Sequence, residues 1–467
     1  MFLTLSHRVH GRHVKALSIG VPFGHSNGMR KLDPTNEWES LLSFLPEGYE
    51  RLAIEHRLVN PQWSNGKVST AKELLRFIFV HAGADLALRQ TVAVVAKGGG
   101  PKISAVRLHQ KMRKARPYLA ALIARMIGGV PAAEAAPQRW GDYEMVCVDA
   151  TAVCSPGAVS TSARVHAVIR LADLGVLDAQ VTSVTEGETL RRFKWTNDQL
   201  IIADRGYSNA PGVAAVLDAQ ADVLVRLNRG SMPIFTADGE LVDVLEWCRA
   251  LTGNRARETA VHVVHRDGKT ERRIDGRLIG FRLPPKEAAD AQARVMRENA
   301  DATAEHVEAA AYVILFTTAP ARRLAAAKCI EAYRLRWQVE LQFKRWKSIC
   351  HLDRLPNYLD DTVCSWLSAK ILLGLILDRI GSVYLDHHEP ASSRPFRALA
   401  LQPWKLTSII WPMIISALMP IRLPDIADLL PDLVAHLSEL DGDDEMDSRQ
   451  LTSTRNRFFP EHGTRAA

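Results

Sequence analysis

The sequence predicts an α/β protein with a mixed sheet flanked by helices. Between residues 145 and 228, three successive β-rich runs are followed by a strand–helix–strand unit. Successive strands favour an antiparallel edge, and the strand–helix–strand unit favours a parallel remainder. Apolar residues at helical spacing occur before and after this region. With 467 residues, 47% hydrophobic and 24% charged, the composition excludes wholesale disorder and allows several structural units.

The first 32 residues predict a basic arm without regular structure. Residues 1–32 contain five cations, four histidines and no acid, and they show little periodicity. Met29 is an alternative start to Met1.

Residues 33–138 predict a helical DNA-binding domain. Ser69 or Thr70 is expected to cap a helix that runs to residue 82, and Ser104 a basic helix over 105–116. In the second helix Val106 and Leu108 can pack in the interior. The cations expected to face outward and bind DNA ends are Arg107, Lys111 and Lys114. Short helices joined by Gly-rich turns suit a helix-turn-helix reader of the major groove. A helical bundle with a solvated basic side is the alternative.

The distribution of charge favours a nucleic-acid partner. The whole chain carries a net charge of +7. Between Leu86 and Ala133 there are nine Lys and Arg residues and no Asp or Glu. A solvated face would normally mix both signs, so this segment is typical of a nucleic-acid surface.

The catalytic core is expected in two parts separated by an insertion. Its first part covers 139–228, with strands over 145–153, 162–172, 177–185, 200–207 and 221–228. Residues 229–311 predict a β-rich insertion, with a hairpin turn at Asp267-Gly268 and a charged helix opening at Pro284-Pro285. Residues 312–385 form the second part, in which a strand over 310–318 leads into one long helix. Residues 386–467 predict an apolar helical pair and a mixed-charge tail.

The composition indicates a soluble, cytoplasmic protein. Six cysteines are scattered without a CxxC pair or zinc spacing, as expected for small buried hydrophobes in a reducing compartment. The N-terminus lacks the apolar stretch of a signal peptide. The most apolar run, 406–421, is shorter than a membrane span and contains Pro412 and Pro420. We therefore expect no membrane contact, and association with the nucleoid through DNA.

Two acids stand where strands should be most hydrophobic. Asp149 interrupts "MVCVDATAV" and Asp204 closes the strand of "LIIADRGY". One such aspartate is usually a turn or cap residue. Two of them, together with a glutamate on a later helix, favour a shared site.

That glutamate belongs to an unusual polar stripe in "YRLRWQVELQFKRWK", residues 333–347. The stripe members are spaced 3, 4, 4 and 3 apart, which places them on one face if the helix is continuous. They are Tyr333, Arg336, Glu340, Lys344 and Lys347. A salt-bridged surface helix explains the Glu340–Lys344 pair but leaves Tyr333 and Arg336 unaccounted for.

Three gathered carboxylates predict divalent cations. Like charges at close range repel unless a cation neutralises them. Oxygen ligands without His or Cys suit Mg²⁺, with Mn²⁺ as the alternative. Two ions about 4 Å apart would serve phosphodiester displacement. In this hypothesis Glu340 binds an ion, Tyr333 and Arg336 hold a DNA phosphate, and Lys344 and Lys347 contact the next phosphates.

The pattern Tyr333-x2-Arg336-x3-Glu340-x6-Lys347 resembles the Y-R-E-K signature of bacterial insertion-sequence transposases of the DDE class. "VDAT" at Asp149 and "ADRGY" at Asp204 are similar to that family's first and second aspartate motifs. "FKRWKSICHLDRLP" and the apolar helix "SWLSAKILLGLILDRI" are similar to the segments on the C-terminal side of its glutamate. The resemblance extends over about residues 100–385.

The resemblance implies a ribonuclease-H-like core in which Asp149, Asp204 and Glu340 are the catalytic, metal-binding triad. The 135 residues between Asp204 and Glu340 fit a β-rich insertion. Family members nick transposon ends, often through a hairpin intermediate, join the freed 3′-hydroxyl to target DNA, and act as dimers on paired ends. Some relatives stack a flipped base on an insertion tryptophan, but Trp247 is expected in the core. Arg205 is a candidate DNA contact, and Tyr207 is expected either to contact DNA or to pack.

Three functions remain open from the sequence. The first is a transposase that binds terminal inverted repeats, cleaves, and joins them to target DNA. The second is a metal-dependent nuclease or resolvase on the same core. The third is a non-catalytic DNA-binding descendant, which the intact set of three acids disfavours.

Overall fold

The computed structural model describes residues 36–62, 68–128, 142–154, 162–251, 255–356, 360–388 and 396–420. The basic arm at 1–32, the alternative start at Met29, residues 129–141 and the tail after residue 420 lie outside these ranges.

In the described part of the chain, eight strands form one mixed sheet in the order β3-β2-β1-β4-β5-β8-β7-β6. β1, β4 and β5 are parallel neighbours, and every other neighbouring pair is antiparallel. The α/β class and the antiparallel edge are therefore confirmed, although β8 returns to the antiparallel direction. The strands are β1 Glu144–Val153, β2 Ala163–Arg170, β3 Val176–Thr182, β4 Gln199–Ala203, β5 Asp222–Arg226, β6 Arg257–Asp267, β7 Thr270–Arg282 and β8 Tyr312–Thr317.

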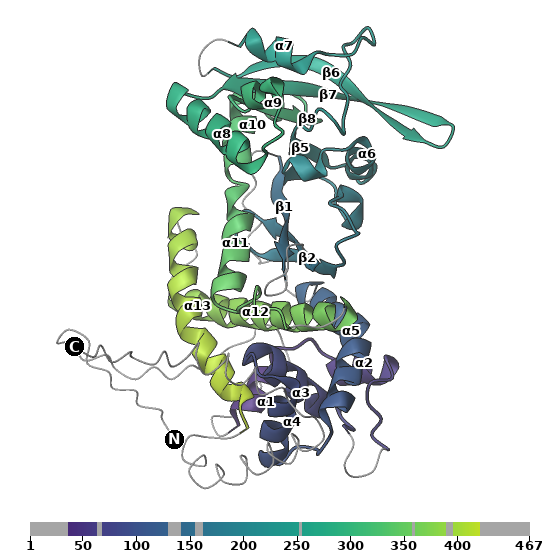
Figure 1. Cartoon of the computed structure of the whole chain (residues 1–467), viewed down its shortest axis with the longest axis vertical. Coiled ribbons are helices and arrows are strands. Elements are labelled where there is room, and N and C mark those ends of the chain that lie inside the picture. Colours follow the sequence, from purple (N-terminus) through teal and green to yellow (C-terminus); the bar gives the residue numbers. More distant parts are fainter. Residues whose placement is uncertain are drawn as a thin grey trace, which may run out of the picture.

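The segment between β5 and β8 extends this sheet. β6 and β7 form a long hairpin, and β7 pairs with β8 along six residues. Three short or charged helices accompany the hairpin at the upper end of the molecule (Figure 1). They are α7 Val244–Arg249, α8 Pro285–Glu298 and α9 Ala304–Ala309. Trp247 packs against the core there, as expected.

Side-chain alternation divides the sheet into two apolar faces. In β1, Cys147 belongs to one buried cluster, while Val146 and Val148 belong to the other. The Cys147 face is covered by α10 (Ala326–Arg334), α11 (Trp337–Ser348) and α12 (Asp360–His388), and the opposite face by α6 (Ala210–Asp218). Figure 1 shows α11 standing beside the sheet and α12 (Asp360–His388) crossing below it. The short helices η1 (Leu190–Arg192) and η2 (Arg205–Tyr207) flank β4.

The N-terminal helices share their core with the later helix α12. They are α1 Glu37–Leu42, α2 Tyr49–Glu55, α3 Ala71–Gly83, α4 Leu88–Lys97 and α5 Ala105–Gly128. Thr70 and Ser104 hydrogen-bond the first turns of α3 and α5, as the sequence predicts.

Two expectations for α5 are wrong. Val106 is 66% exposed, so it does not pack as expected. Lys111 is half-buried and donates a hydrogen bond to the backbone oxygen of Leu58, so it does not face outward. Arg107 and Lys114 are exposed, as predicted.

In the described part of the C-terminal region the apolar run is one helix, and the rest of the region in which a helical pair is expected, after residue 420, lies outside the described residues. α13 spans Phe396–Leu418 and continues through Pro412. Of the ranges that the structure describes, none contains a helix with the length and apolar character needed to cross a membrane. All six cysteines are free, and all but Cys154 are buried.

The expected long helix at residues 333–347 is two helices. α10 ends at Arg334 and α11 covers Trp337–Ser348. Between them the backbone forms hydrogen bonds three residues apart, from Leu335 N to Ala332 O and from Arg336 N to Tyr333 O. This 3₁₀-type turn separates α11 from α10 (Ala326–Arg334). The five polar residues therefore lie on two helices and the turn between them, not on one continuous helix.

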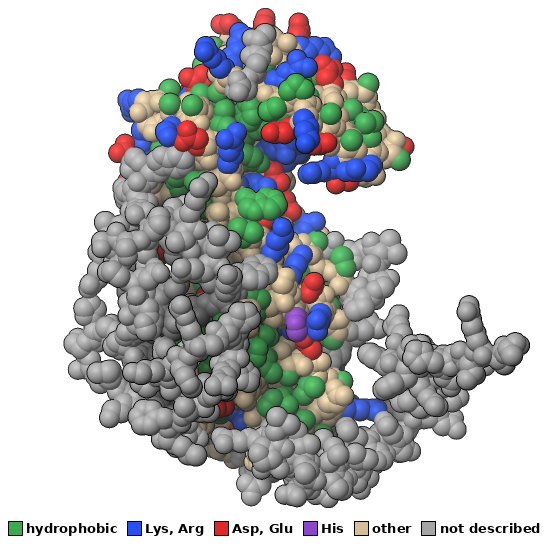
Figure 2. Space-filling model, turned by 90° about the vertical axis from the view of Figure 1, so that its left-hand side faces the viewer, with side chains coloured by type: hydrophobic (Ala, Val, Ile, Leu, Met, Phe, Trp, Pro, Cys, Tyr) green, Lys and Arg blue, Asp and Glu red, His purple; other side chains and the backbone are tan. Residues whose placement is uncertain are grey.

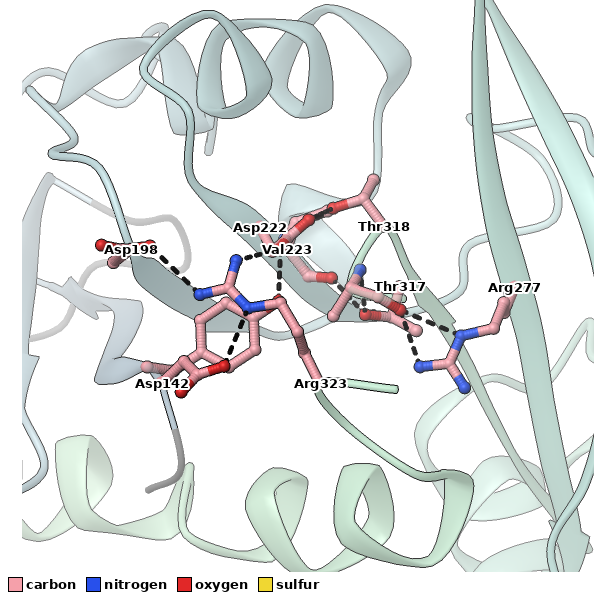
Figure 3. Close-up of polar contacts among 10 residues, drawn as sticks. Asp142, Asp198, Asp222, Val223, Arg277, Thr317, Thr318 and Arg323 are labelled. Carbon is pink, nitrogen blue, oxygen red and sulfur yellow. Dashed lines mark hydrogen bonds and ion pairs between the residues drawn. The ribbon is translucent and has the colours of Figure 1, made fainter. Parts of the chain in front are cut away.

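Two arginines fix the connection from β8 to α10 (Figure 3). Arg323 forms ion pairs with Asp142, Asp198 and Asp222, which lie at or just before the beginnings of β1, β4 and β5. Arg277 of β7 donates hydrogen bonds to the backbone oxygens of Ala319 and Leu324. The extended sheet is thus tied to the segment that leads into α10.

Candidate active site

The strand register places Asp149 and Asp204 side by side. β1 and β4 are parallel, with Cys147 opposite Ile202 and Val148 opposite Ala203. The next pair in this register is Asp149 and Asp204. Cys147 and Ile202 both belong to the buried cluster beneath α11. Because side chains alternate along a strand, both carboxylates point to that same face.

The α10–α11 turn brings three more side chains to the two aspartates. Arg336 Nη1 lies 2.9 Å from Asp149 Oδ2, and Arg336 Nη2 lies 2.6 Å from Glu340 Oε1. The Tyr333 hydroxyl donates a hydrogen bond of 3.0 Å to Asp204 Oδ1. We call these five residues the acidic site. Its three carboxylates come from segments far apart in the sequence, and one guanidinium joins two of them.

Burial and charge compete at the acidic site. Burial raises the pKa of Asp149 to about 6, although Arg336 and the Ala150 amide favour its charged form. For Asp204 burial acts in the same upward direction, but Arg336, the Arg205 amide and Tyr333 outweigh it and lower the pKa. Burial also raises the pKa of Tyr333 well above its ordinary value. Asp149 therefore gains its charge near pH 6, and Asp204 is charged at lower pH.

The two lysines of the motif lie farther along α11. Lys347 Nζ is 3.4 Å from the backbone oxygen of Ala152, so it lies beside the end of β1. Lys344 is exposed and its ammonium lies 4.7 Å from the centre of the Trp337 ring. Arg107, Lys111 and Lys114 lie on α5, below α12 in Figure 1, and do not join the acidic site.

Sequence reasoning singled out Arg205 but missed three further arginines of one cavity. The cavity has a volume of about 1020 Å³, is bounded by β5, α8 and α9, and is lined by Arg205 together with Arg226, Arg229 and Arg294. Arg226 favours the charged form of Asp204. The sequence offered one signal for Arg226, because it is a cation at the end of the predicted strand that follows the Asp204 strand. Figure 2 shows the upper part of the molecule overhanging the body, with Lys and Arg side chains on its underside.

The "DRGY" motif has a packing explanation. A Cβ atom at Gly206 would lie 1.6 Å from Glu188 Oε2, so a larger residue at this position would have to displace the carboxylate of Glu188. Tyr207 is fully buried and its hydroxyl is 3.4 Å from His166 Nδ1. Tyr207 therefore packs, whereas Arg205 is exposed.

The donor set of the acidic site fits a hard divalent cation. It offers carboxylate oxygens without His or Cys, which is the chemistry of Mg²⁺ and Mn²⁺. Over the described ranges, no three acidic, His or Cys side chains are grouped as they would be around a single metal ion. The positive charge between Asp149 and Glu340 is the Arg336 guanidinium.

Comparisons with known proteins agree with this arrangement. A family model described as "Transposase DDE domain" matches residues 140–372, which include both aspartates and Glu340. The transposase for insertion sequence element IS421 of Escherichia coli is 28% identical over 358 residues, covering 75% of this chain and 95% of its own length. InsL of insertion sequence element IS186A of Escherichia coli strain K12 is 28% identical over 357 residues, with the same coverage.

Proposed function

Because the chain belongs to the family of DDE transposases, enzymes that act on DNA and depend on divalent metal ions, we propose that it binds the terminal inverted repeats of an insertion sequence and joins them to target DNA. Cleavage and strand transfer would take place at the acidic site. The convergence of Asp149, Asp204 and Glu340 around the α10–α11 turn is the observation that supports this proposal.

The three carboxylates would hold two Mg²⁺ ions, or Mn²⁺ in their place. When bound, such ions activate the attacking oxygen and stabilise the leaving oxygen of a phosphodiester. The protein's own contribution is to keep the carboxylates at fixed positions on two strand ends and one helix. Tyr333 orients the Asp204 carboxylate through its hydrogen bond.

Cations around the acidic site would bind the DNA backbone. Arg336 and Tyr333 would hold the phosphate nearest the reaction, and Lys344 and Lys347 would hold phosphates farther along α11. Such contacts fix the register of the duplex without reading its sequence. Arg107 and Lys114 are exposed on α5 and would contact the transposon end.

The chain would act as a homodimer on paired ends. The helical domain at 33–138 would select the end, and the core at 139–228 and 312–385 would perform the chemistry. The extension at 229–311 would cover the DNA beside Asp204, since its helices help form the arginine-lined cavity there.

A gel assay tests the proposal. It combines the full chain, Mg²⁺, a labelled terminal-repeat duplex and a target plasmid. Joined products are expected from the wild type. Asp149→Asn, Asp204→Asn and Glu340→Gln should each lose cleavage and joining by about 100-fold or more while end binding persists.

The same gel separates the other functions. Free cleaved ends without joined products would identify a nuclease. Shifted but uncut DNA would identify a DNA-binding protein without catalysis.

A further inference from the structure

The Arg336 side chain is largely buried and bridges two carboxylates of the acidic site. Its side chain is 14% exposed, and each of its two terminal nitrogens contacts a different carboxylate of the acidic site. Its Nε is buried and has no hydrogen-bond partner among the residues that the structure describes. Buried donors are usually hydrogen-bonded, and Arg336 Nε is one of the few buried side-chain donors among the described residues that is not.

The oxygens that Arg336 uses are ones that a metal ion would need. Arg336 contacts Asp149 Oδ2 and Glu340 Oε1, while Asp149 Oδ1 accepts the amide of Ala150. A divalent cation bound by Asp149 and Glu340 would compete with the guanidinium for the same negative charge. The two cations also repel each other at this range.

We propose that Arg336 is a positioning residue that substitutes for the metal ion: it holds Asp149 and Glu340 together in the metal-free enzyme and leaves them when metal binds. This inference rests on the proposed transposase function. It assigns Arg336 two successive partners, first the carboxylates and then a DNA phosphate. The unsatisfied Nε donor fits a side chain that has a second position to occupy.

The exchange would order the binding events. Before metal binds, Arg336 neutralises the acids and is not available to DNA. After metal binds, the guanidinium of Arg336 is released. Arg336 precedes Glu340 by one helical turn, so an incoming phosphate there can accept two parallel N–H hydrogen bonds from it. The Arg336 contact with DNA is thereby made only in an enzyme that already carries metal, whereas end binding through Arg107 and Lys114 does not depend on this exchange.

Mn²⁺ titration of the full chain without DNA tests the exchange. Free Mn²⁺ is followed by electron paramagnetic resonance for the wild type and for Arg336→Gln. We expect Arg336→Gln to bind Mn²⁺ about tenfold more tightly, because the two charge-assisted contacts that compete with the metal ion are lost. A side chain that only supports the fold would leave the affinity unchanged or weaken it, and either result would overturn the proposal.

Arg226→Gln is the matched control. Arg226 acts on Asp204 through its charge, yet over the described ranges it donates no hydrogen bond to the three carboxylates. The Arg226→Gln variant tests the effect of losing one positive charge near the site, and we expect its Mn²⁺ affinity to change by about twofold or less. Equal tightening in both variants would mean general electrostatics and would overturn the exchange.

A second measurement separates this proposal from the proposed function. In EDTA, Arg336→Gln should melt at a lower temperature than the wild type, and Mn²⁺ should raise its melting temperature by more than it raises that of the wild type. An unchanged melting temperature in EDTA would contradict the positioning role. If the wild type binds no Mn²⁺ at the acidic site, the metal-dependent function itself fails, which is a different outcome.

Discussion

At the residue scale, burial opposes the charged form of Asp149. Its side chain is only 16% exposed and it shares the site with two other acids. Burial raises its pKa to about 6, from an ordinary value of about 3.9. Between these pH values the folded protein holds more protons than the unfolded chain, so its free energy of unfolding falls as the pH rises.

The Asp149→Asn variant should remove this pH dependence. The free energy of unfolding of the variant minus that of the wild type should rise by about 1–3 kcal/mol from pH 4 to pH 6 and stay constant above pH 6. Urea unfolding in EDTA at several pH values measures the difference. Asp301→Asn, at an exposed position outside the site, should show no such change. A difference that does not vary with pH would contradict the assigned burial cost.

Two lysines on α5 should differ in DNA binding. Lys114 is exposed, but Lys111 is half-buried against Leu58. Lys114→Ala should lower the slope of log binding constant against log salt by about one unit, as expected for a lost phosphate contact. Lys111→Met should leave the slope unchanged. Fluorescence anisotropy with a terminal-repeat duplex measures both, and equal slopes for the two variants would contradict the placement of α5.

At the element scale, the packing of α11 against α12 determines where Glu340 lies. Trp346 of α11 is 1% exposed and lies against Gly374 of α12. A Cβ atom at Gly374 would be 2.8 Å from Trp346 Nε1. The glycine therefore permits the close approach of the two helices.

Gly374→Ala should destabilise the protein although alanine favours helices. We expect a loss of about 1–3 kcal/mol from overpacking, against a gain of up to about 1 kcal/mol that alanine brings elsewhere in a helix. Gly128→Ala is the control, because a Cβ atom there would have no neighbour within 4 Å. Denaturant unfolding measures both variants. A stabilised Gly374→Ala variant would mean that α11 does not pack against α12 at Gly374.

At the scale of the whole molecule, charged side chains join segments that are distant in sequence. Arg323 stacks on the Tyr143 ring at 4.0 Å from its centre and pairs with three aspartates near the beginnings of β1, β4 and β5 (Figure 3). Lys370 of α12 is fully buried and pairs with Asp85, which lies just after α3. The N-terminal helices are thereby joined to the core.

Arg323→Met should weaken the whole fold. We expect a loss of about 2–3 kcal/mol near pH 7, because Asp222, with a side chain 14% exposed, loses its counter-charge. Arg249→Met removes an exposed ion pair with Glu308 and should leave the free energy of unfolding close to that of the wild type. Similar losses in the two variants would contradict a central role for Arg323.

Part of this structure is predictable from the sequence, because strand periodicity and turn residues are local. The three successive strands, the Asp267-Gly268 hairpin and the helix after Pro284 occur where the pattern predicts them. The DDE family was also recognisable from the Tyr333-x2-Arg336-x3-Glu340-x6-Lys347 pattern together with the motifs around Asp149 and Asp204.

The interruption between α10 and α11 was not predictable in this way. Residues 332–340 contain no Gly or Pro, so the local sequence favours a continuous helix. Contacts of Tyr333 and Arg336 with aspartates on β1 and β4 accompany the tighter turn. Lys111 was misplaced for the same reason, since its partner Leu58 belongs to a distant segment. The polarity of these residues gave no indication of which of them would be buried.

The most direct test of the central claim is anomalous diffraction from crystals of the full chain soaked with Mn²⁺. We predict Mn²⁺ bound by oxygens of Asp149, Asp204 and Glu340, with the Arg336 guanidinium no longer between Asp149 and Glu340. Mn²⁺ bound only elsewhere, with Arg336 still joining the two carboxylates, would contradict the account.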